Sequence, residues 1–169
     1  MKTLANRNNQ NGVGMIEVLV ALFILAVGLL GVLAMQANSI KGSQKSQFST
    51  QAQFLAQDMV DRIVAFNDID DPNDDDDYDD LDTDDADADD AACAATGCDA
   101  AAQKAYDTWD WGTQVTSRLP NGKGTVEYDD TDDKYVVTVM WDSELNGATG
   151  EDCTGASGQM ACYILEFKL

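Results

Sequence analysis

The stretch GVGMIEVLVALFILAVGLLGVLAM, residues 12–35, decides how this chain is organised. Past Val13 it is apolar throughout, apart from one charged side chain, Glu17, near its start. A helix of this length rises about 1.5 Å per residue and covers roughly the 30 Å hydrocarbon core of a bilayer. A carboxylate in such a span costs on the order of 2.5–3.5 kcal/mol at the centre and less near an end, so Glu17 is a candidate functional residue.

The segment before this span, residues 1–12, is short and polar and contains Lys2 and Arg7 but no acid. A secretory signal peptide also begins with basic residues, but its cleavage site follows the apolar region. No A-x-A site follows Met35, and residues 34–51 continue as a helix-forming sequence, AMQANSIKGSQKSQFSTQ. The alternative is an uncleaved signal anchor in which Glu17 has no role.

The sequence from Gly12 to Leu22 resembles the prepilin signature of type IV pilins and type II secretion pseudopilins. This resemblance implies that prepilin peptidase cuts between Gly12 and Val13 and N-methylates Val13, which makes Glu17 the fifth mature residue. It also implies that Glu17 sets the register of assembly by pairing with the N-terminal amine of a neighbouring subunit. The family usually has Phe at the first mature position, where this chain has Val13. Many major pilins have proline where this chain has Ala34, so the second difference favours a minor pilin or a pseudopilin.

The composition limits the kinds of function. The 169 residues suit one domain plus an anchor, and 10 Lys and Arg against 31 Asp and Glu give a net charge of −21. Removing residues 1–12 takes away two positive charges and leaves −23. This acidity argues against direct binding of nucleic acid, which needs a basic surface. The absence of histidine rules out Ser-His-Asp and Cys-His catalysis and histidine-ligated metals. We therefore predict that the protein is not an enzyme and has no cofactor.

Four cysteines lie beyond the apolar span, at Cys93, Cys98, Cys153 and Cys162. They belong to the part that an anchored chain of this class would expose to the periplasm, which oxidises thiols, so disulfides are expected. Four cysteines allow three connectivities, of which we favour nearest-neighbour pairing, Cys93 with Cys98 and Cys153 with Cys162. Zinc is a weaker alternative, because neither pair has C-x-x-C spacing and no histidine can complete the site.

Residues 13–36 are expected to form the transmembrane and assembly helix, and residues 37–67 its amphipathic continuation in a globular head. Apolar residues recur there at spacings of three and four, which indicates one buried helical face. They are Phe48, Ala52, Leu55, Met59, Ile63 and Phe66. The helix should end near Asn67. The sequence LAQDMVDRIVAFN, residues 55–67, resembles the stretch that follows the anchor in PilV-type minor pilins.

Residues 68–99 read as an acidic insert. Fifteen of the twenty-three residues from Asp68 to Asp90 are Asp and none is Lys or Arg, which predicts disorder. Four residues match positions of an EF-hand loop: Asp71, Asn73, Asp75 and Asp82. Because Asp76 replaces the glycine that such a loop needs, we predict no formed metal site, and weak cation binding stays an alternative.

Residues 100–169 are expected to complete the head. A shorter helix is predicted over Ala100–Leu119, with two offset apolar stripes and a possible break at Gly112. Strands are predicted over Thr125–Tyr128, Lys134–Trp141 and Cys162–Leu169, because apolar residues alternate there. The predicted fold class is therefore α+β, with one long N-terminal helix packed on a small antiparallel sheet.

This tail also resembles PilV-type minor pilins, in its Trp-containing helix, its Leu-Pro-Asn-Gly turn and its final aromatic strand. The resemblance implies a minor pilin that helps prime or modify type IV pilus assembly and supports adhesion, twitching motility and DNA uptake. Its partners would be other minor and major pilins, the prepilin peptidase, the inner membrane and the pilus assembly platform. It would lie in the bacterial inner membrane with its head in the periplasm before assembly, and in the pilus at the cell surface afterwards. The alternatives are a minor pseudopilin of type II secretion and a calcium-binding, membrane-anchored periplasmic protein.

Overall fold

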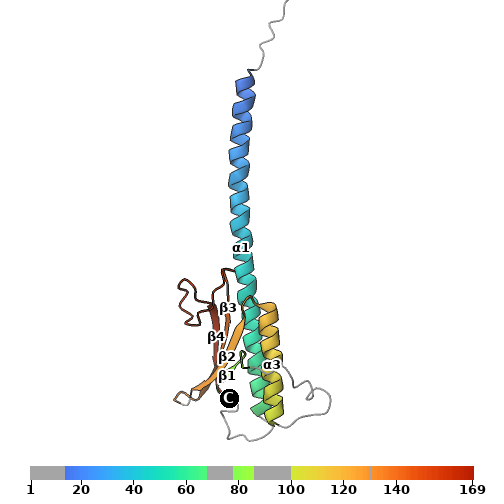
Figure 1. Cartoon of the computed structure of the whole chain (residues 1–169), viewed down its shortest axis with the longest axis vertical. Coiled ribbons are helices and arrows are strands. Elements are labelled where there is room, and N and C mark those ends of the chain that lie inside the picture. Colours follow the sequence, from blue (N-terminus) through green and yellow to red (C-terminus); the bar gives the residue numbers. More distant parts are fainter. Residues whose placement is uncertain (1–13, 68–77, 86–99, 130) are drawn as a thin grey trace, which may run out of the picture. The chain divides into compact units, whose positions relative to one another are not determined.

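The computed structural model describes residues 14–67, 78–85, 100–129 and 131–169 (Figure 1). In chain order its elements are α1 (Met15–Asn67), β1 (Leu81–Asp82), α3 (Ala100–Arg118), β2 (Lys123–Asp129), β3 (Lys134–Trp141) and β4 (Ala161–Phe167). The chain divides into two compact units, residues 1–43, here called the N-terminal unit, and residues 44–169, here called the head.

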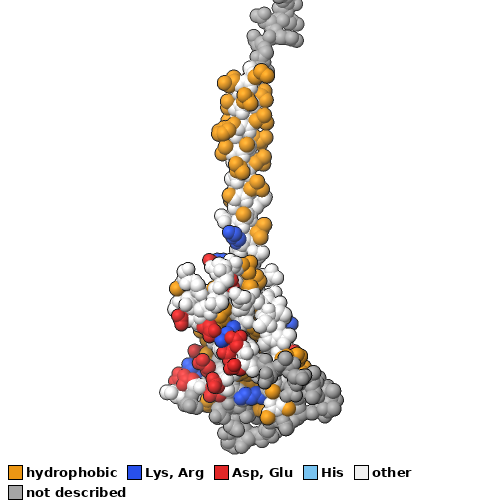
Figure 2. All heavy atoms as spheres, viewed as in Figure 1, with side chains coloured by type: hydrophobic (Ala, Val, Ile, Leu, Met, Phe, Trp, Pro, Cys, Tyr) orange, Lys and Arg blue, Asp and Glu red, His pale blue; other side chains and the backbone are white. Residues whose placement is uncertain are grey.

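The N-terminal unit is built from the first part of α1, which begins at Met15. Its large apolar side chains, between Met15 and Ile40, are exposed all around the helix and form the apolar column in Figure 2. The exposed fraction is 87 % for Met15 and 61 % for Ile40. By length and composition, α1 is able to cross a membrane. The glycines at 28, 31 and 42 do not interrupt the helix.

The sheet of the head has four antiparallel strands in the order β1-β2-β3-β4. β2 and β3 form a hairpin whose register runs from Lys123 opposite Met140 to Asp129 opposite Lys134. The alternation of β3 places Tyr135, Val137 and Val139 on the buried face. The α+β fold class predicted from the sequence is confirmed, and the predicted C-terminal end of α1 and both predicted ends of β3 match the observed ones.

The core of the head lies between the sheet and two helices, the C-terminal part of α1 and α3, which run side by side in Figure 1. All three contribute fully buried large side chains, among them Leu55, Met59, Ile63, Trp111, Val115, Val126, Tyr135, Val137 and Val139. The indole N–H of Trp111 donates a hydrogen bond to the backbone carbonyl of Leu55 at 2.9 Å. This contact ties α3 to α1 inside the core.

Gly124 in β2 lets the sheet approach Trp111 closely. A Cβ built on Gly124 would collide with the six-membered part of the Trp111 ring, which is completely buried. Any larger residue at 124 would push the strand away from α3, and such overpacking typically costs 1–3 kcal/mol.

Part of the acidic insert is ordered, so the prediction of disorder over residues 68–99 is wrong for residues 78–85, here called the clasp. Tyr78 and Leu81 of the clasp are buried in the core, at 0 % and 5 % exposure. The clasp also supplies β1, which pairs with β2 through Leu81 opposite Val126 and Asp82 opposite Thr125. Tyr78 and Leu81 are large apolar residues in an aspartate-rich sequence, and their burial offsets the charge that the clasp carries. Residues 68–77 and 86–99 lie outside the described part of the chain.

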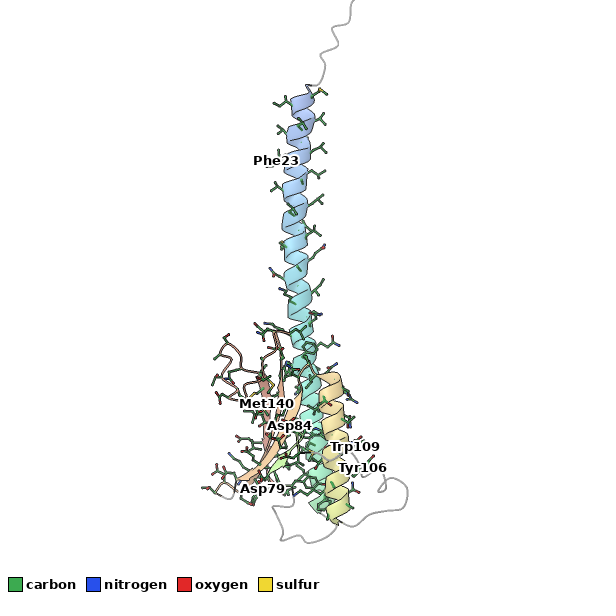
Figure 3. The ribbon with its side chains drawn as sticks, in the orientation of Figure 1. Phe23, Asp79, Asp84, Tyr106, Trp109 and Met140 are labelled. Carbon is green, nitrogen blue, oxygen red and sulfur yellow. A yellow bond between two sulfur atoms is a disulfide. The ribbon has the colours of Figure 1, made fainter. Side chains whose placement is uncertain are left out.

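α3 is one continuous helix through Gly112, and only one of its two predicted apolar stripes enters the core. Trp111 and Val115 are buried, as is Leu119 just after the helix. Tyr106 and Trp109 are half-buried and lie against each other, with ring centroids 5.9 Å apart, on the side of α3 turned away from the sheet (Figure 3).

Candidate functional site

Glu17 lies in the first turn of α1, where its backbone N–H donates to the carbonyl of Gly14 at 2.8 Å. An acid is favoured there, because the N-terminal end of a helix carries partial positive charge. Its side chain is exposed, like those of its neighbours Met15 and Ile16. Within the described part of the N-terminal unit, the charged residues are Glu17 and Lys41. At about 1.5 Å per residue they are roughly 36 Å apart along the axis, so Glu17 has no counter-ion in its own helix.

Four residues singled out from the sequence lie outside the described residues. They are the residues of the predicted cleavage and methylation site, Gly12 and Val13, and the cysteines Cys93 and Cys98. Their roles stay predictions. Gly14, the first described residue, is exposed and directly precedes α1.

Cys153 and Cys162 form a disulfide that closes the loop between β3 and β4, with their Cα atoms 5.4 Å apart. Both cysteines pack on a second, small apolar cluster made by Met140, Ala148 and Met160. The disulfide therefore holds a Gly-rich loop against the face of the sheet that is turned away from the helices.

Asp142, directly after β3, organises the same loop. Its carboxylate accepts hydrogen bonds from the backbone N–H of Glu144 at 3.2 Å and of Gly147 at 2.7 Å. Burial raises the pKa of Asp142, but the backbone N–H groups that face it lower the pKa by more, so the pKa lies below its ordinary value. The two ends of this loop, near Asp142 and near Gln159, border a cavity of about 200 Å³.

Arg62 of α1 is the centre of an ion-pair network. It contacts Asp58, four residues earlier on the same helix, at 3.0 Å, and Asp107 at 3.0 Å and Asp110 at 2.5 Å, both on α3. Tyr78 of the clasp donates its hydroxyl to Asp107 at 2.8 Å. One guanidinium thus connects α1, α3 and the clasp.

The sequence contained a signal for this network. Asp107 is four residues before Trp111 and eight before Val115, which places an acid on the buried face of α3. A buried carboxylate needs a cation or several hydrogen bonds, and Arg62 is the basic residue that faces it.

Lys123 at the start of β2 makes a second network. Its ammonium group is 3.0 Å from Asp82, 3.1 Å from Asp84 and 2.9 Å from Glu151. Burial lowers the pKa of Lys123, but its hydrogen bonds to Glu151, Asp82 and Asp84 raise the pKa by more, and the result is well above the ordinary value. Asp82 of β1, one of the residues that matched the EF-hand pattern, is therefore paired with Lys123 of β2.

Comparison with known families finds a match at the N-terminus. Residues 7–33 match the model of the prokaryotic N-terminal methylation motif. No curated protein and no solved structure matches the chain. The matched range includes Gly12, Val13 and Glu17, the residues assigned above to cleavage, methylation and assembly.

The motif carries family-level consequences. Prepilins of this kind are processed by prepilin peptidase and assemble with other pilins, and they are in general structural proteins rather than enzymes. An apolar helix with this motif indicates anchoring in the inner membrane before assembly. The chain thus carries the N-terminal methylation motif of the type IV prepilin and pseudopilin family.

Proposed function

We propose that the protein is a minor pilin of the PilV type, which helps to prime or modify the assembly of a type IV pilus. The observation that carries the proposal is Glu17, alone in the first turn of a helix whose other side chains there are apolar and exposed. Such a helix is suited to a membrane first and to a bundle of like helices afterwards. Cleavage after Gly12 would create the positive amine that Glu17 lacks within its own helix.

The head is consistent with the subtype. α3 contains Trp109 and Trp111, the chain turns at Pro120-Asn121-Gly122, and β3 ends in Trp141 before Asp142. A disulfide-closed loop then leads into the aromatic strand β4. These features match the stretches that resemble PilV-type minor pilins in sequence, and Ala34 in place of proline favours a minor subunit over a major one.

The proposed mechanism is transfer of the apolar helix from lipid to filament. Leaving lipid for a helix bundle exchanges one apolar environment for another, so hydrophobic burial contributes little to the choice between them. Helix packing and the buried charge pair at Glu17 would then set the position of the subunit. As proposed here, the filament supports adhesion, twitching motility and DNA uptake, without direct contact between this chain and nucleic acid.

Mass spectrometry of the mature protein tests the processing step. The expected mature chain begins at Val13 and carries an N-methyl group. A mature chain that begins at Met1, or one cut after Met35, would contradict the pilin function.

Deletion of the gene in its host separates the pilus role from the pseudopilus role. We expect less pilin in the sheared surface fraction and weaker twitching, both restored by the wild-type gene, while type II secretion continues. Loss of secreted substrates with normal pili would instead assign the chain to a type II secretion pseudopilus, which the N-terminal motif fits equally well.

A further inference from the structure

The clasp covers the edge of β2 through hydrogen bonds as well as through its two buried side chains and the β1–β2 pairing. The backbone N–H of Thr83 donates to the carbonyl of Gly124 at 3.0 Å, and the N–H of Gly124 donates to the Thr83 hydroxyl at 2.9 Å. At the other end of the clasp, the N–H of Tyr128 donates to the Asp79 carboxylate at 2.7 Å. Two amides of β2, at Gly124 and Tyr128, therefore have acceptors on clasp side chains and lose them when the clasp leaves.

The clasp is acidic and docks on a part of the head that is also acidic. It contains five carboxylates, at 79, 80, 82, 84 and 85. The hairpin between β2 and β3 adds Asp129, Asp132 and Asp133, and Glu151 lies beside the other end of β2 through its contact with Lys123. Acidic side chains gather over the sheet-bearing side of the head in Figure 2. Figure 3 shows Asp79 and Asp84 at different heights along the sheet.

The cations near the clasp are few. Lys123 pairs with Asp82 and Asp84, and Lys104 lies over the Tyr78 ring, 6.0 Å from its centroid. On the hairpin, Lys134 is already paired with Asp132 and Glu166. The Lys123 side chain is only 13 % exposed, so salt screens its ion pairs less than it screens the exposed carboxylates around them. The exposed charges that remain repel one another.

We propose that the clasp is an ionic-strength-dependent closure of the β2 edge, which docks more firmly as salt screens the carboxylates. Apolar burial of Tyr78 and Leu81 and the Lys123 ion pairs hold it in place, and repulsion between the clasp and the hairpin opposes them. Ordinary surface ion pairs weaken with salt, so a rise in stability with salt has the opposite sign and identifies net repulsion.

Hydrogen exchange of the full chain in a non-ionic detergent tests this closure. NaCl is raised from about 0.01 M to about 1 M, over which the Debye length falls from about 30 Å to about 3 Å. Exchange of the clasp amides and of the Gly124 and Tyr128 amides should slow several-fold. The amides that are hydrogen-bonded between β3 and β4 should not slow to the same extent. Choline chloride should act as NaCl does, because screening does not depend on ion identity.

Charge variants test the cause. Asp80 and Asp85 are exposed, and no side-chain contact of theirs appears among the described residues. The double variant Asp80→Asn and Asp85→Asn should protect the clasp at low salt and flatten its salt dependence; asparagine also tolerates the positive φ of 55° at position 80. The control, Asp61→Asn with Glu17→Gln, changes net charge equally at exposed positions of α1 and should keep the wild-type salt dependence.

Two results would overturn the closure. The first is clasp exchange that is constant or faster as salt rises. The second is a control pair that flattens the salt dependence as much as the clasp pair does, because net charge of the whole chain would then be the cause.

Discussion

At the residue scale, Glu17 combines a favourable place in its own helix with a charge that has no counter-ion within that helix. The first turn of α1 stabilises a carboxylate, yet no cation lies near it in the described N-terminal unit. A position that is acceptable for one chain and incomplete without a second chain is what an assembly contact requires. Lys41, the other charge in this unit, is too far along the helix to serve.

Replacing Glu17 with valine separates insertion from assembly. Glu17→Val should insert into the membrane at least as well as the wild type and be cleaved after Gly12, but it should enter pili poorly. Losing one partner of a buried charge pair costs about 3–5 kcal/mol when the other stays charged. Immunoblots of sheared pili and of membranes measure both steps, with Glu17→Asp as the intermediate case. Wild-type amounts of Glu17→Val in sheared pili would show that the charge does not control incorporation.

Arg62 gives the second prediction at this scale. In Arg62→Met, the carboxylate of Asp107, only 9 % exposed, keeps its hydrogen bonds but loses its cation. The free energy of unfolding should fall by about 3 kcal/mol. Urea denaturation followed by tryptophan fluorescence measures this loss. Asp58→Asn is the matched control, because its side chain is 43 % exposed and its loss should cost less than about 1 kcal/mol. Equal losses in the two variants would mean that the network is only a surface feature.

At the scale of elements, the clasp turns an apparent insertion into part of the core. If residues 70–90 were a disordered insert, their deletion would leave the head folded, because almost nothing apolar would be lost. The buried Tyr78 and Leu81 and the β1–β2 pairing now lead us to expect the opposite.

The deletion should therefore lower the melting temperature of the head strongly. Tyr78→Ala should reproduce most of this, at about 3–5 kcal/mol, since it removes an aromatic ring that packs edge-on against Phe66. Tyr78→Phe should cost about 1.5–3 kcal/mol, because it removes a buried hydrogen bond to the charged Asp107 carboxylate. Circular dichroism on heating measures all three. A deletion variant that melts with the wild type would restore the interpretation of residues 68–99 as a dispensable insert.

The loop after β3 has a predictable response to acid. The folded-state pKa of Asp142 is lowered, so its contribution to stability is present above its ordinary value of about 4 and is lost as pH falls through the folded value. Asp142→Asn should lower stability at neutral pH and make the acid loss below about pH 4 less steep. Asp152→Asn is the control, because Asp152 is exposed and its backbone N–H, rather than its carboxylate, donates to the Gln159 side chain at 2.9 Å. This variant should leave the profile unchanged. Parallel profiles for the wild type and Asp142→Asn would exclude this role.

At the scale of the whole molecule, local patterns in the sequence predicted the elements but not the contacts between distant ones. The ends of α1 and β3 follow from three-four spacing and from alternation, both of which are local. β1 could not be predicted from propensity, because two residues in an aspartate run become a strand only when β2 offers an edge. The pairing of Arg62 with Asp107 and Asp110 likewise depends on how α1 and α3 pack.

The candidate site shows the same division. Glu17 and its register with Gly12 could be predicted from the sequence because the motif is short and contiguous, and residues 7–33 match the methylation-motif model. Lys123 was missed, because the three carboxylates around it come from positions 82, 84 and 151 and meet only in the folded head. The signal that could have found it was the alternation of β2, which turns Lys123 away from the buried Gly124 and Val126.

The setting of Lys123 has a consequence for chemical labelling. Amine-reactive esters acylate the neutral form of lysine, and three carboxylates hold the Lys123 amine in its protonated form, with a raised pKa and little exposed surface. Among the residues that the structure describes, no side-chain carboxylate pairs with the exposed Lys41 or Lys168, and both remain open to the reagent. A fluorophore ester applied to the folded protein would therefore label those lysines and leave Lys123 unmodified. Labelled chains could then be imaged while the ion pairs between Lys123 and the clasp stay intact.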